Sequence, residues 1–176
     1  MIEIRIPDPS LVVLVGAAGA GKSTFATRQF ESSAVLSSDA HRALISGDPA
    51  DQTVSRVAFA RLHRALERRL SDRQLSVVDA TNLGRGARLV LLRLAAKAGV
   101  PAVAIVFDLP AEVILARNAA RTERVVGESV VRHHLAQVRA MLDGPGADIG
   151  VEGFAGVTVL RDPLDVDAVT VVRVAG

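Results

Sequence analysis

Short apolar runs alternate along the chain with segments whose apolar residues recur every three or four positions. The runs are typical of strands buried on both faces of a parallel sheet, and the periodic segments are typical of helices with one buried side. Strands are predicted at residues 11–15, 34–37, 75–78, 102–109 and 157–160. Helices are predicted at residues 24–30, 40–46, 53–70, 86–98 and 128–142, with another that opens at Pro110 and runs through Arg117 and Arg121.

The two ends of the chain carry weaker patterns. Residues 2–6 alternate isoleucine with charged residues, which predicts a half-exposed edge strand that stops at Pro7 and Pro9. Residues 166–174 fit either a short helix or a strand. The regular strand–helix alternation predicts one domain over residues 1–176, a three-layer α/β/α sandwich around a five-stranded, mostly parallel sheet. Ligands of such sheets bind at the carboxyl ends of the strands.

Composition narrows the class of protein. The chain is 49% hydrophobic and 23% charged, which indicates a folded domain, and its formal net charge is only +2. It has no cysteine, so disulfides and thiolate metal sites are excluded. No apolar run approaches the roughly 20 residues of a membrane span, and the N-terminus lacks the order of a signal peptide. We therefore expect a cytoplasmic protein without a membrane partner.

The strand at residues 11–15 leads directly into a G-x-x-x-x-G-K-S motif and then a helix. Its glycines let the backbone curl around an anion, so that N–H groups and the helix dipole face phosphate oxygens. Lys22 is expected to point into open loop space and reach the β- and γ-phosphates, and Ser23 to hold Mg²⁺. The motif predicts a P-loop protein that binds ATP or another nucleoside triphosphate. The expected binding residues are Gly16, Ala17, Ala18, Gly19, Ala20, Gly21, Lys22, Ser23 and Thr24.

Two carboxylates follow other predicted strands. Asp39 precedes Arg42 by one helical turn, so it can accept a proton from an attacking hydroxyl while Arg42 holds an anionic acceptor. The alternative is that Asp39 caps a helix beginning at Ala40 and that Arg42 is a solvated surface residue. Asp79 ends the strand at residues 75–78 and is expected to organise Mg²⁺ through water, or else to shape a turn.

Arg117, Arg121 and Arg124 are spaced to lie along one face of a helix. Such like charges repel unless an anion lies between them, and a bound triphosphate would relieve the repulsion. Alternatively they form a solvated face that pairs with nearby glutamates. The arginines of the helix at residues 53–70 are interpreted as solvated, and His63, His133 and His134 show no metal-ligand spacing.

Five motifs in this order resemble one family. They are G-x-x-x-x-G-K-S-T-F, L-S-S-D-x-x-R, D-Q-T-V, V-V-D-A-T-N and R-N-x-x-R-T-x-R. The chain resembles the polynucleotide 5′-kinase module of the bacterial Pnkp RNA end-healing proteins from about Ile4 to Val172. The resemblance implies an adenylate-kinase-like fold with a helical lid at about residues 117–130. It also implies ATP, Mg²⁺, and 5′-hydroxyl RNA or DNA ends as acceptors.

By the same resemblance, Asp39 is the general base, Arg42 contacts the acceptor's phosphate, and Arg117 and Arg121 clamp the donor phosphates. Family members often have serines where this loop has alanines, and they usually continue into phosphatase and nucleotidyltransferase domains. Phosphatase and ligase domains or proteins are therefore expected partners. Two alternatives remain open. One is a small-metabolite or toxin-type kinase of the same fold, and the other is a nucleotide-dependent binding module without acceptor chemistry.

Overall fold

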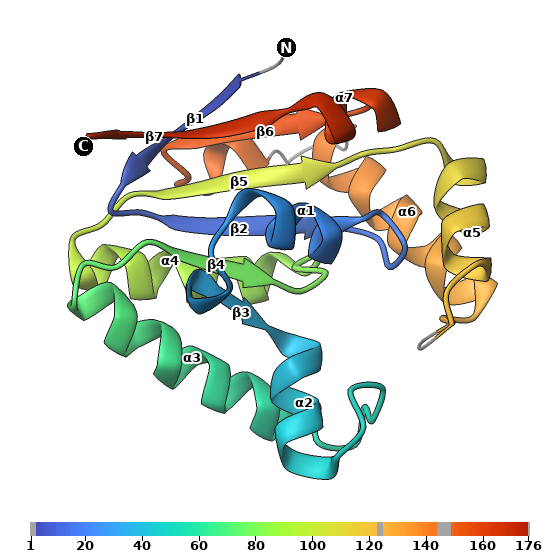
Figure 1. Ribbon diagram of the computed structural model, residues 1–176, viewed down its shortest axis with the longest axis horizontal. Helices are drawn as coiled ribbons and strands as arrows, with labels where there is room; N and C mark the ends of the chain where they lie inside the picture. The colour runs from blue at the N-terminus through green and yellow to red at the C-terminus, as the bar shows by residue number, and fades with distance from the viewer. Residues whose placement is uncertain (1–2, 123–124, 144–148, 176) are drawn as a thin grey trace.

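The computed structural model describes residues 3–122, 125–143 and 149–175 and is shown in Figure 1. Its strands are β1 (Glu3–Asp8), β2 (Leu11–Gly16), β3 (Val35–Ser37), β4 (Ser76–Asp79), β5 (Ala102–Phe107), β6 (Gly156–Leu160) and β7 (Thr170–Ala175). Its α-helices are α1 (Lys22–Gln29), α2 (Ser38–Ser46), α3 (Ser55–Ser71), α4 (Arg85–Ala98), α5 (Ala111–Ala119), α6 (Glu128–Asp143) and α7 (Pro163–Ala168). Short 3₁₀ turns cover Ser32–Ala34 and Ile149–Val151. No helix within these ranges is both long and apolar enough to span a membrane.

A five-stranded sheet forms the centre of the domain, in the order β3-β4-β2-β5-β6. All of its neighbouring strands are parallel, so the predicted five strands and their orientation are confirmed. Every residue of β2, β4 and β5 is buried, because helices cover both faces of the sheet and leave no side of these strands to solvent. The carboxyl ends of the strands therefore meet at one edge, beside α1, α2 and α5 (Figure 1).

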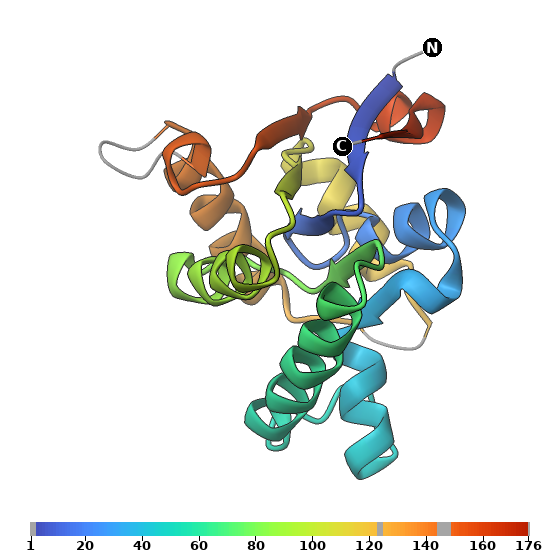
Figure 2. The same cartoon turned by 90° about the vertical axis from the view of Figure 1, so that its left-hand side faces the viewer.

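Two hydrophobic cores lie on the two faces of this sheet. Alternate residues of β2 point to opposite sides, with Val12 and Leu14 in one core and Leu11, Val13 and Val15 in the other. The first core is filled mainly from α1, α5, β1 and α7, and the second mainly from α3, α4 and the end of α6. In Figure 2 the sheet is seen nearly end-on, with α4 and α6 on its left and α1 and α7 on its right. The predicted three-layer arrangement is confirmed.

The chain termini pair with each other instead of extending the central sheet. β1 and β7 form a separate two-stranded parallel sheet, from Glu3 opposite Thr170 to Asp8 opposite Ala175. β1 includes Pro7 and ends at Asp8, so the prediction that the first strand stops at Pro7 and Pro9 is confirmed to within one residue. A two-stranded sheet leaves each strand an open edge, where a proline without an N–H is tolerated. The tail contains both of the alternatives considered for it, because α7 is followed directly by β7.

The helix that opens at Pro110 is shorter than expected. α5 ends at Ala119, so Arg121 lies beyond it and does not continue a helical face with Arg117. Asn118 explains the change of direction, because its buried side-chain amide donates to the Val126 carbonyl at 2.7 Å and accepts from the Val126 N–H at 3.1 Å. These two bonds join the end of α5 to a residue that lies just before α6. The predicted lid, residues 117–130, includes positions 123–124 outside the described residues, and its movement stays a prediction.

Candidate active site

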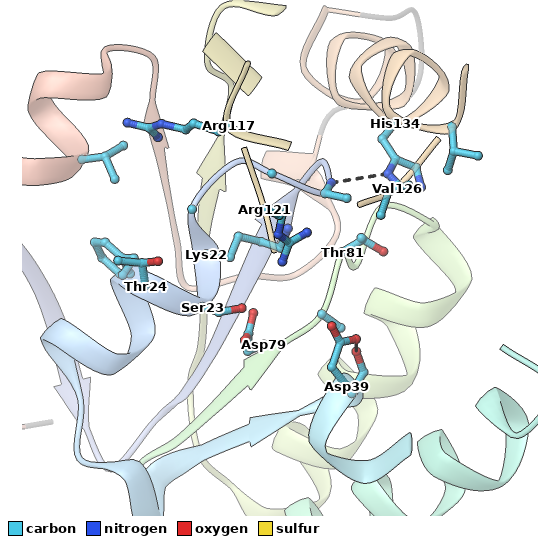
Figure 3. Close-up of a pocket in the computed structure, with 18 of the residues that line it drawn as sticks. Lys22, Ser23, Thr24, Asp39, Asp79, Thr81, Arg117, Arg121, Val126 and His134 are labelled. Carbon is cyan, nitrogen blue, oxygen red and sulfur yellow. Dashed lines mark hydrogen bonds between the residues drawn. The ribbon is translucent and has the colours of Figure 1, made fainter. Parts of the chain in front are cut away.

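A cavity of about 780 Å³ lies at the carboxyl edge of the central sheet. Segments far apart in the sequence line it: the P-loop and α1, the start of α2, the end of β4, the end of α5 and the start of α6. Its volume lies in the range of pockets that bind nucleotides and other small ligands. Figure 3 shows the side chains of Ser23, Asp79 and Arg121 directed into this space, with Asp39 at its lower rim.

The P-loop adopts the backbone conformation that its glycines permit. Gly19 has φ of 88°, and a Cβ there would lie 2.9 Å from the Ile114 carbonyl oxygen. Gly16 has φ of 155°, and a Cβ there would lie 3.0 Å from the Phe107 Cβ in β5. A side chain would therefore be strained by the backbone conformation at both positions, and at Gly19 it would also clash with the Ile114 carbonyl. These contacts seat the loop against β5 and α5, at the start of helix α1.

Lys22 is held by the loop to which it belongs. Its Nζ atom donates hydrogen bonds of 2.8 Å to the carbonyl oxygens of Gly16 and Ala17, and the residue is only 7% exposed. The expectation that Lys22 points into open loop space is therefore wrong. A buried ammonium group needs acceptors, and the loop carbonyls supply them. The lysine charge is consequently fixed beneath the cavity, which Lys22 also lines.

Asp79 lies at the floor of the same cavity, at the end of β4. Burial raises the pKa of its carboxyl above the ordinary value, while a hydrogen bond from Ser23 and the charges of Lys22 and Arg121 oppose this rise. The charge of Asp39 also raises this pKa, so the two carboxylates are near enough to interact. A hydroxyl beside a carboxylate is a suitable pair for holding a hydrated Mg²⁺ ion.

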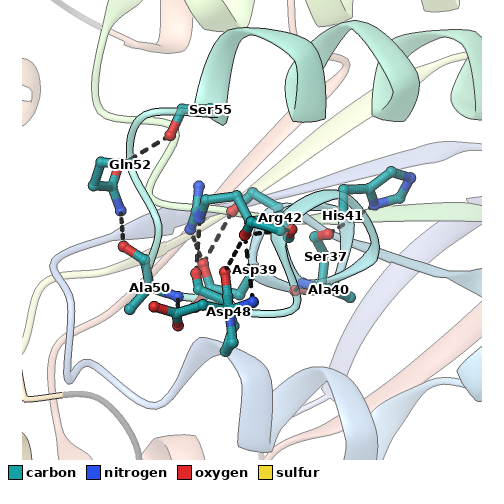
Figure 4. Close-up of polar contacts among 12 residues, drawn as sticks. Ser37, Asp39, Ala40, His41, Arg42, Asp48, Ala50, Gln52 and Ser55 are labelled. Atoms are coloured by element: carbon teal, nitrogen blue, oxygen red, sulfur yellow. Dashed lines mark hydrogen bonds and ion pairs between the residues drawn. The ribbon is translucent and has the colours of Figure 1, made fainter.

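Asp39 and Arg42 lie together in the first turns of α2 (Figure 4). Arg42 forms an ion pair with the Asp39 Oδ1 atom, and its Nε atom donates to the Pro49 carbonyl oxygen at 2.8 Å. The cap of α2 is Ser37, whose side chain accepts from the Ala40 N–H at 3.3 Å. The alternative in which Asp39 caps this helix is therefore wrong. Arg42 is 4% exposed, so the alternative of a solvated arginine is wrong as well.

The predicted nucleotide-binding residues divide into two groups. Those that line the cavity are Ala18, Gly19, Gly21, Lys22, Ser23, Thr24, Arg117 and Arg121. Gly16, Ala17 and Ala20 are buried and do not line it, and the side chains of Ala17 and Ala20 belong to the hydrophobic core. Arg117 lies over the start of α1, since a Cβ at Gly21 would be 3.5 Å from its guanidinium. Arg124 falls outside the described residues.

His134 has no role predicted from the sequence, yet it lines the cavity. Its Nδ1 atom accepts a hydrogen bond of 3.4 Å from the Ala18 N–H and so joins α6 to the P-loop. Val126 and Val130 lie on the same side of the cavity, and Gln52 and Phe59 also line it. The sequence does indicate that Val130 and His134 share one face of a helix, because they are four residues apart. It does not indicate that this face of α6 contacts the P-loop.

Comparison with known proteins identifies the family and the fold. The AAA_33 family model, described as an AAA domain, matches residues 11–145, and a search of curated proteins finds no match. The chain resembles a chain of the Pnkp1/Rnl/Hen1 RNA repair complex with a TM-score of 0.65 and 24% identity. That match covers 76% of this chain and 45% of the other, so this chain spans less than half the length of that relative.

Two smaller enzymes share the fold. One is a gluconokinase from Sinorhizobium meliloti 1021, with a TM-score of 0.51, 21% identity, and coverage of 90% of this chain and 87% of the other. The second is the APS kinase from Mycobacterium tuberculosis, solved with AMPPNP and APS, with a TM-score of 0.50, 20% identity, and coverage of 65% and 71%. Because the family model matches more than half of the chain, the chain belongs to the AAA_33 family of AAA domains, and its P-loop and fold agree with this assignment.

Proposed function

We propose that this domain transfers the γ-phosphate of ATP to the 5′-hydroxyl end of RNA or DNA. The observation that carries the proposal is the Asp39–Arg42 pair, which lines the same cavity as the P-loop lysine and serine. A carboxylate is suited to accept a hydroxyl proton, and an arginine beside it is suited to hold a phosphate of the acceptor. A neutral sugar does not need that second charge.

The reaction assigns one task to each group. The 5′-oxygen attacks the γ-phosphorus and forms the new P–O bond as the bond to the β–γ bridging oxygen breaks. Asp39 takes the proton of the attacking hydroxyl. Lys22, Arg117 and Arg121 neutralise the negative charge on the transferred phosphoryl group and the charge that develops on the leaving ADP. Ser23 and Asp79 are the residues that would hold Mg²⁺, Ser23 directly and Asp79 through water, and the ion would supply positive charge to the donor phosphates.

The competing function is a small-metabolite kinase, because the gluconokinase match covers nearly all of both chains. The buried cation beside Asp39 favours an anionic acceptor over a neutral one. Among anionic acceptors we favour a polynucleotide because of the motifs shared with polynucleotide 5′-kinase modules. A chain of the RNA repair complex has the same fold at a TM-score of 0.65. A polynucleotide kinase of this type would work with phosphatase and ligase activities on the same RNA ends, and these activities would lie in further domains or in separate proteins.

Substitution of Arg42 by alanine tests the acceptor. We expect KM to rise by about tenfold or more for a nucleoside 3′-phosphate, since a hydrogen bond between charged groups is lost. For the matching nucleoside without phosphate, KM should change far less. Because Arg42 also holds Asp39, kcat should fall similarly for both acceptors. The measurement is the steady-state rate with both acceptors and both enzymes. An equal change in KM for the two acceptors would contradict the role of Arg42 and favour the metabolite kinase.

A further inference from the structure

A buried ion pair stands behind the cavity, at the loop between β4 and α4. Arg88 of α4 binds Glu152 through two hydrogen bonds, from Nε to Oε2 at 2.8 Å and from Nη2 to Oε1 at 2.5 Å. Their side chains are only 3% and 2% exposed. The two residues are 64 positions apart in the sequence, and neither lines the cavity. Burial of two charges costs free energy because both lose their hydration. The other contacts that this pair makes therefore indicate its role.

Arg88 uses its remaining donor atom to hold the loop. Its Nη1 atom donates to the carbonyl oxygens of Asn82 at 3.0 Å and Leu83 at 2.6 Å. Asn82 has φ of 49°, a left-handed conformation that L residues rarely adopt. Its side chain is also committed, because Nδ2 donates to the Leu14 carbonyl oxygen of β2 at 2.7 Å. Arg88 therefore supports a loop in an unusual backbone conformation.

The supported loop is joined to the P-loop. The Thr81 carbonyl oxygen accepts a hydrogen bond of 3.0 Å from the N–H of Gly16, the first residue of the phosphate-binding motif. Thr81 also lines the cavity, and Asp79 stands two residues before it at the end of β4. The contacts run from Glu152 to Arg88, from Arg88 to the loop, and from the loop to Gly16 and the end of β2.

We propose that Arg88, neutralised by Glu152, is a positioning residue that sets the P-loop and the end of β4 for binding of the magnesium–nucleotide complex. The inference rests on the P-loop part of the proposed function and not on the identity of the acceptor. Partners that orient binding groups from behind commonly change metal affinity or activity by about ten- to a hundredfold when removed. Arg88 acts through the loop that it holds, which bonds Gly16 of the P-loop through Thr81 and Val78 of β4 through Asn82.

The test separates positioning from general stability. The double variant Arg88→Met/Glu152→Leu removes both buried charges, a replacement that often leaves stability intact. Arg69→Met is the matched control, because Arg69 binds the Leu75 carbonyl and the Ser76 hydroxyl at the opposite end of β4. Glu152→Gln keeps Arg88 and its bonds to the loop. Each protein is measured for its Tm and for its Kd for AMPPNP, with and without Mg²⁺, well below the lowest Tm.

We expect the double variant to bind Mg²⁺–AMPPNP about tenfold or more weakly, with a smaller loss without Mg²⁺. Arg69→Met should lower Tm and leave Kd within about twofold. Glu152→Gln should also lower Tm, because it leaves the buried Arg88 charge without its carboxylate, and should keep Kd near that of the wild type, because the bonds of Arg88 to the loop remain. If the double variant does not fold, Arg88→Lys replaces it, since lysine keeps a charge for Glu152 without the fork that reaches both carbonyls. Unchanged affinity in the substituted protein, or an equal loss in Arg69→Met, would overturn the proposal. Absence of transfer to polynucleotides would leave these binding results standing.

Discussion

Lys22→Met should reduce phosphoryl transfer by about a hundredfold to a thousandfold, the size expected when a fixed group that stabilises transition-state charge is lost. Lys22 is only 7% exposed and is held by the Gly16 and Ala17 carbonyl oxygens, so its charge is already in place before nucleotide binds. Methionine keeps much of the apolar stem and limits the change to the ammonium group. The measurement is kcat and kcat/KM with saturating acceptor, together with Tm.

Lys97→Met is the matched control for this substitution. Lys97 is an exposed lysine on α4 that pairs with Glu67, an interaction of little energetic weight at the surface. We expect its activity to equal that of the wild type. Retention of more than about a tenth of the activity in Lys22→Met would mean that the P-loop lysine does not stabilise the transferred phosphate.

Asp39→Asn should lower kcat by about a hundredfold or more, because the amide cannot accept the proton of the attacking hydroxyl. The size and the hydrogen-bonding oxygen of the side chain are retained, so Arg42 still has a neighbour at this position. ATP affinity should change little, since the predicted nucleotide-binding residues lie on the P-loop and in the region of Arg117 and Arg121. Single-turnover rates and a separate measurement of the ATP Kd distinguish the two effects.

Asp48→Asn serves as the control for Asp39. Asp48 follows α2, is exposed, and accepts a hydrogen bond of 2.8 Å from the Ala50 N–H, a bond that asparagine can also accept. Its substitution should leave kcat unchanged. A kcat for Asp39→Asn within about threefold of the wild type would mean that water, and not Asp39, accepts the proton of the attacking hydroxyl. The main argument for acceptor chemistry would then be lost.

The central sheet was predictable because its signals are local. The apolar runs of β2 and β5 and the glycines of the P-loop determine their conformations within a few residues. Because these signals are local, the sequence also predicts that Lys22, Ser23 and Asp79 lie at the carboxyl edge of the sheet. Parallel strands bring their carboxyl ends together whatever the rest of the chain does.

The errors arose where distant residues decide the outcome. α5 ends early because Asn118 bonds to Val126 eight residues later, and a helical spacing pattern does not include such a bond. β1 and β7 pair across nearly the whole chain, and neither strand indicates its partner. His134 reaches Ala18 over 116 positions. Such contacts depend on the assembled fold, so periodicity and spacing within one segment do not reveal them.

The most direct test of the proposed activity is transfer of labelled γ-phosphate from ATP to a panel of acceptors at equal concentration. The panel contains 5′-hydroxyl RNA, 5′-hydroxyl DNA, gluconate and APS, each with wild type and with Asp39→Asn. We predict label on the 5′ end of RNA or DNA, removable by a phosphatase and nearly absent with Asp39→Asn. Label on gluconate or APS with none on either polynucleotide would contradict the proposal, and so would binding of ATP without transfer to any acceptor.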